Sequence, residues 1–211
     1  MKSIEIVKKQ VKDSANVKKA LLEDTGTLEK IALAGDRCID AYKNGNKIMF
    51  AGNGGSAADA QHFAGELVSR FYFDRPGLPS IALTTDTSIL TAIGNDYGFD
   101  RLFARQVEAQ GIKGDVFVGI STSGNSSNIV EAMKTCRKMG IVTIGLTGDK
   151  PCRMDEFSDI IIKVPSTETP RIQECQTLIG HILCCIIEAG IFAPCPATSE
   201  TPSAAGNGTD E

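Results

Sequence analysis

The sequence predicts an α/β protein, a three-layer αβα sandwich around a five-stranded parallel sheet with extra helices at the N-terminus. Five short apolar runs alternate with helical segments along the chain. Within each run the apolar residues are continuous, as in the strands of a parallel sheet that helices cover on both faces. The length of 211 residues, with 42% hydrophobic and 23% charged residues, suits one domain with a sizeable core.

The expected elements follow in order. Residues 3–45 carry apolar side chains at helical spacing, and a break at 24–27 divides them into two helices, the second starting near Thr27 and ending at the C-cap glycine Gly45. Strands are expected at residues 47–51, 80–83, 115–120, 141–146 and 159–164. Helices are expected at 56–72, 87–110 and 126–139, with a strongly apolar final helix at about 172–192.

We expect residues 1–193 to form a single domain, of which residues 1–45 are a helical N-terminal extension. Residues 194–211 contain Ser, Thr, Pro, Gly and Asp but almost no large apolar side chains. That composition predicts a disordered tail, because it cannot bury enough apolar surface to offset the entropy of ordering the chain.

Charge and cysteine content exclude several classes of partner. The formal net charge of −4 provides no basic field for nucleic acid. Residues 1–5 lack the apolar core of a signal peptide, and His181 and Glu188 interrupt the most apolar stretch, 179–192, which argues against a membrane span. The seven cysteines show no Cys-x-x-Cys spacing and fit free thiols in a reducing compartment. We therefore expect a cytoplasmic protein with no nucleic acid and no membrane as partner.

The first informative loop is Gly52-Asn53-Gly54-Gly55-Ser56, between an expected strand and an expected helix. Glycines let backbone amides approach an anion, and the helix N-terminus adds a favourable partial charge. The spacing matches neither a Walker loop nor a dinucleotide-binding fingerprint. A tight turn with Ser56 as a simple N-cap explains the loop equally well.

The second loop, Ser121-Thr122-Ser123-Gly124-Asn125-Ser126-Ser127-Asn128, is more specific. Five hydroxyl side chains occur within residues 121–127, at the carboxyl end of a strand, where open α/β sheets bind ligands. Hydroxyls and helix-start amides can bind a phosphate without Lys or Arg in the loop. A hydroxyl-rich cap and turn would account for one or two of these residues, but not for all of them.

The helix after the first loop carries His62 and Glu66, four residues apart and so on one helix face. The chain has two histidines, and the second, His181, lies in the apolar final helix. Spacing alone leaves two interpretations open, a metal site and a histidine packed in the core.

Together these segments resemble the phosphoheptose isomerases, members of the sugar-isomerase (SIS) domain superfamily with a flavodoxin-like fold. The resemblance rests, in order, on Gly52 to His62, on Thr91-Ala92-Ile93-Gly94-Asn95-Asp96, on Ser121 to Ser126, and on Arg171-Ile172-Gln173-Glu174 with His181. It implies an isomerase that converts sedoheptulose 7-phosphate into D-glycero-D-manno-heptose 7-phosphate through an enediol. This would be the first step of ADP- or GDP-heptose precursor synthesis for lipopolysaccharide core or other surface glycans.

The resemblance also implies roles for individual residues. It implies one Zn²⁺ per site, with the metal ligands His62, Glu66, Gln173 and His181. It implies Glu66 as the catalytic base and His181 as the acid. The implied substrate contacts are Asn53, Gly54, Gly55, Ser56, Glu66, Asn95, Asp96, Ser121, Thr122, Ser123, Ser126 and Gln173. Arg70, one turn after Glu66, could also reach the site. The family further implies a homotetramer with active sites at the subunit interfaces and a phosphorylated heptose as substrate.

Gln173 and His181 lie eight residues apart, about 12 Å along a helix. Both can bind one ion only if Gln173 precedes the regular helix or if a second subunit contributes, so we predict a site shared between subunits. Two alternatives are a non-enzymatic SIS-domain regulator of the replication-initiator-associating type and an isomerase of another phosphosugar. The presence of both Glu66 and His181 favours the enzyme.

Overall fold

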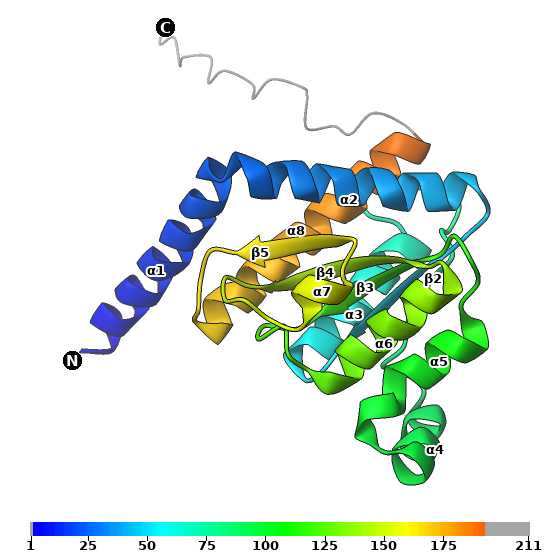
Figure 1. The fold of residues 1–211 in the computed structure, drawn as a ribbon. Helices are drawn as coiled ribbons and strands as arrows, with labels where there is room; N and C mark the ends of the chain where they lie inside the picture. The colour runs from blue at the N-terminus through cyan, green and yellow to red at the C-terminus, as the bar shows by residue number, and fades with distance from the viewer. Residues whose placement is uncertain (1, 193–211) are drawn as a thin grey trace, which may run out of the picture.

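The computed structural model describes residues 2–192, and these form an α/β sandwich around one sheet (Figure 1). All strand pairs are parallel, in the order β2-β1-β3-β4-β5. The strands are β1 Ile48–Gly52, β2 Ser80–Ala82, β3 Val116–Ile120, β4 Val142–Gly148 and β5 Ile160–Val164. The predicted fold class is therefore confirmed, and the expected tail at 194–211 lies outside the described residues.

Helices form the two outer layers. They are α1 Ser3–Glu23, α2 Thr25–Lys43, α3 Gly55–Val68, α4 Thr87–Tyr97, α5 Leu102–Gln110, α6 Ser127–Met139, α7 Met154–Phe157 and α8 Thr169–Ile191, with a 3₁₀ turn, η1, at Phe99–Arg101. The core on one face of the sheet contains Phe50 together with residues of α2, α3 and α8. The core on the other face contains Met49 together with residues of α4, α5 and α6. Neighbouring strand residues thus point into different cores, which explains the continuous apolar runs.

Four helix boundaries differ from the sequence prediction. Helix α2 begins at Thr25 and not near Thr27, because Asp24 is its N-cap and accepts a hydrogen bond from the amide of Thr27. The segment expected as one helix at 87–110 is divided at Gly98, whose φ of 84° is incompatible with a continuing helix. Helix α3 ends at Val68 and not at residue 72. Helix α8 begins at Thr169, before the expected start, because Pro170 in its first turn is preorganised for a helix N-terminus. The short helix α7 was not predicted.

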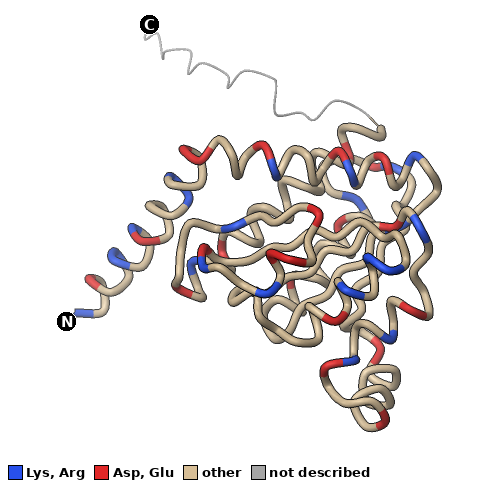
Figure 2. Tube along the Cα trace, in the orientation of Figure 1, with Lys and Arg blue, Asp and Glu red and all other residues tan. Residues whose placement is uncertain are grey.

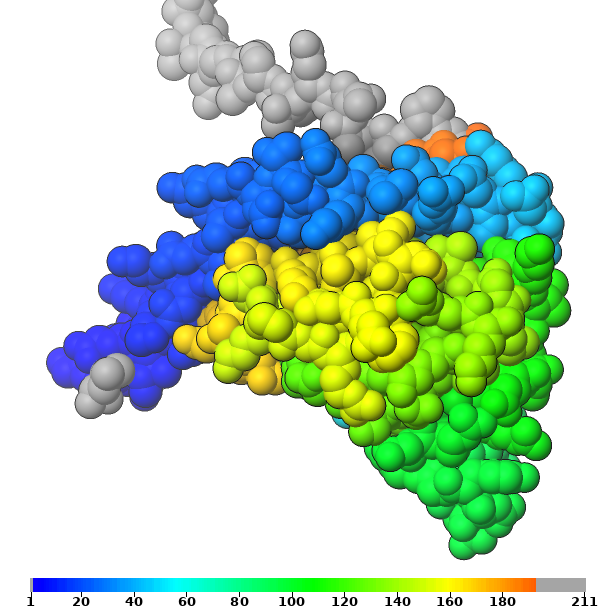
Figure 3. Space-filling model, viewed as in Figure 1, coloured from blue at the N-terminus to red at the C-terminus, as the bar shows by residue number. Residues whose placement is uncertain are grey.

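Helix α1 projects from the body of the molecule (Figures 1 and 3). Its apolar side chains are largely in solvent, with Ile4 56%, Val7 55% and Val11 65% exposed. The guanidinium of Arg171 on α8 donates a hydrogen bond to the carbonyl of Gln10, 2.6 Å away. Within residues 2–192 the chain therefore does not bury the apolar side of its first helix.

Helix α8 is long and apolar enough to cross a membrane by length and composition. Its residues Ile179, Leu183 and Ile187 belong to the core that also contains residues of the sheet, α2 and α3. The high hydropathy of α8 is therefore explained by its packing in the core of the protein. Basic and acidic residues are intermixed along the described chain in Figure 2, consistent with the mild net charge.

Candidate active site

The hydroxyl loop follows β3 and leads into α6, at the carboxyl edge of the sheet. Its side chains point toward one another, since the Oγ atoms of Ser121 and Ser126 lie 2.9 Å apart and that of Ser123 lies 3.5 Å from Ser121. Gly124 at the tip has a φ of 65°, a conformation that favours glycine. The loop thus gathers several hydroxyls at the start of a 13-residue helix.

Ser126 argues against the interpretation of this loop as a simple cap. It occupies the N-cap position of α6, yet its side chain makes no capping hydrogen bond. A simple cap would instead accept a hydrogen bond from the backbone amide two or three residues later. The hydroxyl is directed at Ser121, and with the N-terminal amides of α6 it can bind an anion. A cavity of about 210 Å³ adjoins the loop on the side of Thr122, Ser123 and Asn125.

The glycine loop lies next to the hydroxyl loop, and a reciprocal amide pair joins them. Asn53 Nδ2 donates to Asn128 Oδ1, and Asn128 Nδ2 donates to Asn53 Oδ1, both at 2.9 Å. Asn128 is 1% exposed. Sequence reasoning assigned no role to Asn128, although it stood in the quoted loop. The pair fixes the position of the two loops relative to each other.

Gly54, not Ser56, is the N-cap of α3, with a φ of 55°. Interpreting Ser56 as a simple cap is therefore wrong, because the helix begins at Gly55 and Ser56 is buried in its first turn. The backbone of Gly52 lies so close to the backbone of Ser56 that a side chain at position 52 would overlap it. The first loop is thus a compact turn that directs the N-terminus of α3 toward the carboxyl edge of the sheet.

His62, Glu66 and His181 form a three-residue cluster between α3 and α8. His62 Nε2 lies 3.1 Å from Glu66 Oε1 and 3.2 Å from His181 Nε2. One ligand atom from each residue lies within 4.8 Å of the others. All three belong to the same chain, so one chain by itself brings Glu66 and His181 together, and the sharing of the site between subunits stays a prediction. The cluster is open on one side, because the side chain of His62 is 41% exposed.

The donors of this cluster fit zinc. Two imidazole nitrogens and a carboxylate oxygen are typical ligands of a catalytic zinc site with an open position. Two nitrogens bound tetrahedrally at about 2.0 Å from one zinc ion lie about 3.3 Å apart. The distance of 3.2 Å between the Nε2 atoms of His62 and His181 agrees with that value.

Gln173 lies eight residues before His181 on the same helix, α8. It belongs to α8, which begins at Thr169, so the idea that Gln173 precedes the regular helix is wrong. Its side-chain amide packs against Gly55, at the N-terminus of α3. This position is next to the glycine loop and suits a substrate contact. Its role as a fourth metal ligand, about 12 Å of helix rise before His181, remains a prediction.

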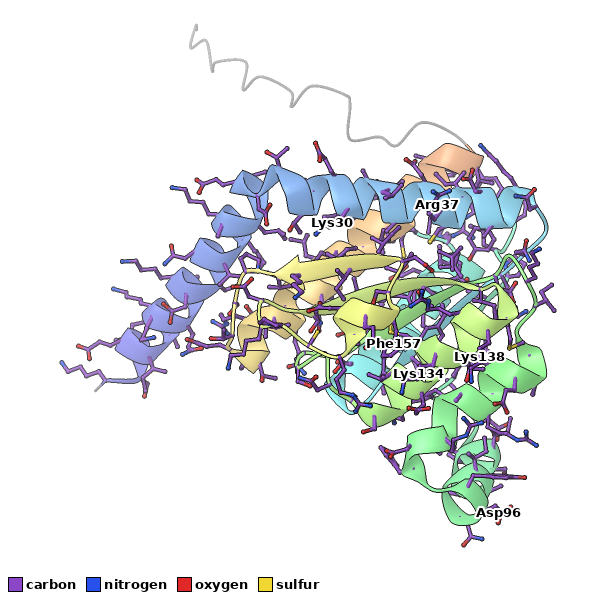
Figure 4. The ribbon with its side chains drawn as sticks, in the orientation of Figure 1. Lys30, Arg37, Asp96, Lys134, Lys138 and Phe157 are labelled. Atoms are coloured by element: carbon purple, nitrogen blue, oxygen red, sulfur yellow. The ribbon has the colours of Figure 1, made fainter. Side chains whose placement is uncertain are left out.

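Asn95 and Asp96 lie at the end of α4, on the lobe that α4 and η1 form (Figure 4). Both are exposed, and Asn95 Nδ2 donates to Asp96 Oδ1 at 2.8 Å. Figure 4 shows Asp96 pointing outward from the tip of the lobe. Their assignment as substrate contacts remains a prediction. Arg70 is exposed in the segment after α3, and its role also remains a prediction.

Several polar residues around the site had no role in the sequence prediction. Arg153 donates from its backbone amide to Asn125 and from its guanidinium to Ser127, so a basic side chain does adjoin the hydroxyl loop. Asp59, one turn before His62, accepts a hydrogen bond from Thr177 at 3.0 Å. Burial raises the pKa of Asp59, and the hydrogen bond from Thr177 opposes this. These contacts join distant parts of the chain, and no local pattern indicates them.

Comparison with known proteins identifies the class first. The model of the SIS domain family matches residues 11–148, so the chain belongs to the SIS domain family. A phosphoheptose isomerase of Aneurinibacillus thermoaerophilus is 60% identical over 186 residues, 88% of this chain and 94% of that protein. Phosphoheptose isomerase 2 of Campylobacter jejuni is 62% identical over 186 residues, 88% of this chain and 92% of that protein.

The solved structures agree with the sequences. The phosphoheptose isomerase from Neisseria gonorrhoeae superposes with a TM-score of 0.83 at 41% identity, covering 89% of this chain and 100% of that one. Within the SIS family the chain therefore belongs to the phosphoheptose isomerases.

Proposed function

We propose that the protein is an aldose–ketose isomerase that converts sedoheptulose 7-phosphate into D-glycero-D-manno-heptose 7-phosphate. The observation that carries this proposal is the cluster of His62, Glu66 and His181 on α3 and α8, in a chain that also gathers phosphate-binding hydroxyls in the loop after β3. A regulator needs only the phosphate site. The imidazole–carboxylate cluster adds groups that can move protons.

The reaction transfers a proton between the first two carbons of the sugar. The hydroxyls of Ser121 and Ser126 bind the phosphate, and this remote binding energy orients the carbonyl end of the substrate. Glu66, as the base, removes the proton from one carbon and returns it to the neighbouring carbon. When a zinc ion is bound by the cluster, it supplies Lewis-acid polarisation of the carbonyl.

His181 would have two functions in such a site. Its Nε2 faces the Nε2 of His62, as expected for a metal ligand. A ring nitrogen that binds a metal cannot also donate a proton, so a proton that His181 transfers to the substrate oxygen must come from Nδ1. Gln173, against Gly55, would contact the substrate between the two ends of the site.

We also propose that the enzyme is a homotetramer with shared active sites. The largely exposed apolar side of α1 and the partly open metal cluster each leave a surface for another subunit to cover. Asn95 and Asp96 on the projecting α4 lobe would extend into the site of a neighbouring subunit. We place the enzyme in the cytoplasm, in precursor synthesis for lipopolysaccharide or other surface glycans. The buried thiols of Cys38, Cys136, Cys175 and Cys184 are consistent with a reducing compartment.

The test is turnover of sedoheptulose 7-phosphate by purified protein, with and without a chelator. We expect product with wild-type protein, loss of activity after chelation, and recovery when zinc is restored. Glu66→Gln, which keeps the size of the side chain, should abolish turnover and leave phosphate binding intact. Binding of the sugar phosphate without any conversion would refute the isomerase and favour a regulator on the same fold.

A further inference from the structure

A second polar cluster lies on α8, beside the metal cluster but outside it. Glu188 is two turns after His181, on the same face of the helix, and its side chain is 1% exposed. Its Oε1 forms an ion pair with Arg75 Nε at 2.9 Å and accepts from the backbone amide of Phe71 at 3.0 Å. Its Oε2 accepts from the amide of Tyr72 at 2.7 Å. Glu188 thus holds the segment that follows α3 against α8.

Arg75 extends this network to the catalytic helix. Its side chain is 2% exposed. One terminal nitrogen donates to the backbone carbonyl of Glu66 at 2.9 Å, and the other donates to Leu67 at 2.6 Å and to Ser69 at 3.2 Å. The last carbonyls of a helix have no partner within the helix, so Arg75 caps the C-terminus of α3 where Glu66 lies.

The same network reaches the other side of the metal cluster through Phe71. The ring of Phe71 lies 5.6 Å from that of His181, at an interplanar angle of 34°. Because Glu188 accepts from the backbone amide of Phe71, it determines where this ring packs. Glu188 and Arg75 therefore act on Glu66 through its main chain and on His181 through one aromatic side chain.

We propose that the buried Arg75–Glu188 pair positions the metal-binding and proton-transfer cluster. Stability alone is a weak explanation for the pair, since a buried ion pair loses hydration and apolar side chains of similar volume are often equally stable. Directed hydrogen bonds, in contrast, define angles that apolar packing does not. Both side chains are buried and bonded to other parts of the chain, so we assign them as positioning residues. The kinetic part of the proposal rests on the proposed function, whereas the metal-binding part does not.

The chain offers a matched control for the test. Asp115 is also a buried carboxylate, and it pairs with Lys47 Nζ at 2.6 Å. It accepts hydrogen bonds from the backbone amides of Lys47 at 3.0 Å and Ile112 at 2.9 Å. It precedes β3, and its hydrogen-bond partners, Asn46, Lys47 and Ile112, lie outside α3, α8 and the segment that follows α3. Asp115→Asn and Glu188→Gln thus remove the same kind of buried charge, the first away from the helices that carry the metal cluster and the second on one of them.

The experiment measures the melting temperature, zinc affinity against a chromogenic chelator, and steady-state kinetics for wild type and both variants. We expect both variants to melt at lower temperature. Glu188→Gln alone should lose roughly tenfold or more in zinc affinity and in kcat, with KM nearly unchanged, as for the loss of an outer partner of metal ligands. Equal effects of the two variants on zinc affinity and kcat would overturn the proposal.

A second variant covers the case in which Glu188→Gln does not fold. Phe71→Leu keeps the ion pair and the backbone amide but removes the ring that packs on His181. It should also lower zinc affinity and kcat, and wild-type values for both would overturn the proposal. If wild-type protein binds zinc without turning over the sugar phosphate, the proposed function fails, and the zinc affinities still decide the role of Glu188.

Discussion

Gly180 on α8 allows α8 and α3 to approach each other, so Gly180→Ala should disturb the His62/Glu66/His181 cluster between them. The residue precedes His181, and its backbone packs against the ring of Phe63, which follows His62. A Cβ at position 180 would overlap three carbons of that ring. The adjoining cavity holds only about 10 Å³ and is bordered by core residues such as Leu67, so the ring has no space to enter.

The magnitude follows from two opposing terms. Overpacking of a dense core costs about 3 kcal/mol at the upper end of its usual range, and the overlap with an aromatic ring indicates that end. Replacing glycine by alanine in a helix restores about 1 kcal/mol. The net loss of about 2 kcal/mol predicts a melting temperature lower by about 4–8 °C for a chain of this length. Because Phe63 is next to His62 and Gly180 is next to His181 in the sequence, kcat should fall as well.

Thermal denaturation and steady-state kinetics would check this prediction, with Gly65→Ala as the control. Gly65 lies within α3, is exposed, and would place its Cβ in open space. That variant should gain about 1 kcal/mol from helix propensity alone. Adding Phe63→Leu to Gly180→Ala should recover part of the loss and show a positive coupling energy. An unchanged or higher melting temperature for Gly180→Ala would refute the reasoning.

Three further predictions test other parts of the molecule. Ser126→Ala should raise KM by roughly tenfold with little change in kcat, because its hydroxyl would contact only the phosphate; a fall confined to kcat in steady-state kinetics would contradict this. Burial acts to raise the pKa of Asp115, but hydrogen bonds from Lys47 and from backbone amides lower it below the usual 3.8. The ionised Asp115 carboxylate therefore stabilises the fold above about pH 3.8, and this stabilisation is lost as the pH falls through the lower pKa of the folded state. Asp115→Asn should flatten the acid side of a curve of stability against pH, measured by thermal denaturation. An equal mixture of Glu66→Ala and Asp96→Ala subunits, refolded together, should regain about one quarter of wild-type activity if two subunits form each site; no recovery of turnover would exclude that arrangement.

The strands were predictable because their physics is local. A run such as Val116–Ile120 is apolar at almost every position, and only a strand covered on both faces buries such a run. The ends of elements were less predictable. Residues 87–110 keep a helical pattern throughout, yet Gly98 stops the helix with a positive φ. A glycine that ends a helix has few distinguishing neighbours in the sequence.

The candidate site shows the same division. His62 and Glu66 share a helix face, so their proximity follows from spacing four residues apart. His181 lies 119 residues after His62 in the sequence and contacts it in the structure. Spacing alone did not show whether His181 was a metal ligand or a histidine packed in the core. Gln173 lies within the final helix, which removes one of the two ways in which it could share an ion with His181, because the helix begins at Thr169 with Pro170 in its first turn.

By itself, the sequence determined the class of fold and the candidate residues for the chemistry, because apolar periodicity and loop composition are properties of short segments. Only the tertiary structure decided which groups meet. It brought Glu66 and His181 into one cluster and joined the two loops through Asn53 and Asn128. It also formed the Arg75–Glu188 pair beside the cluster. The physical reason is that each of these contacts depends on how separate elements pack, and packing is settled by the whole core at once.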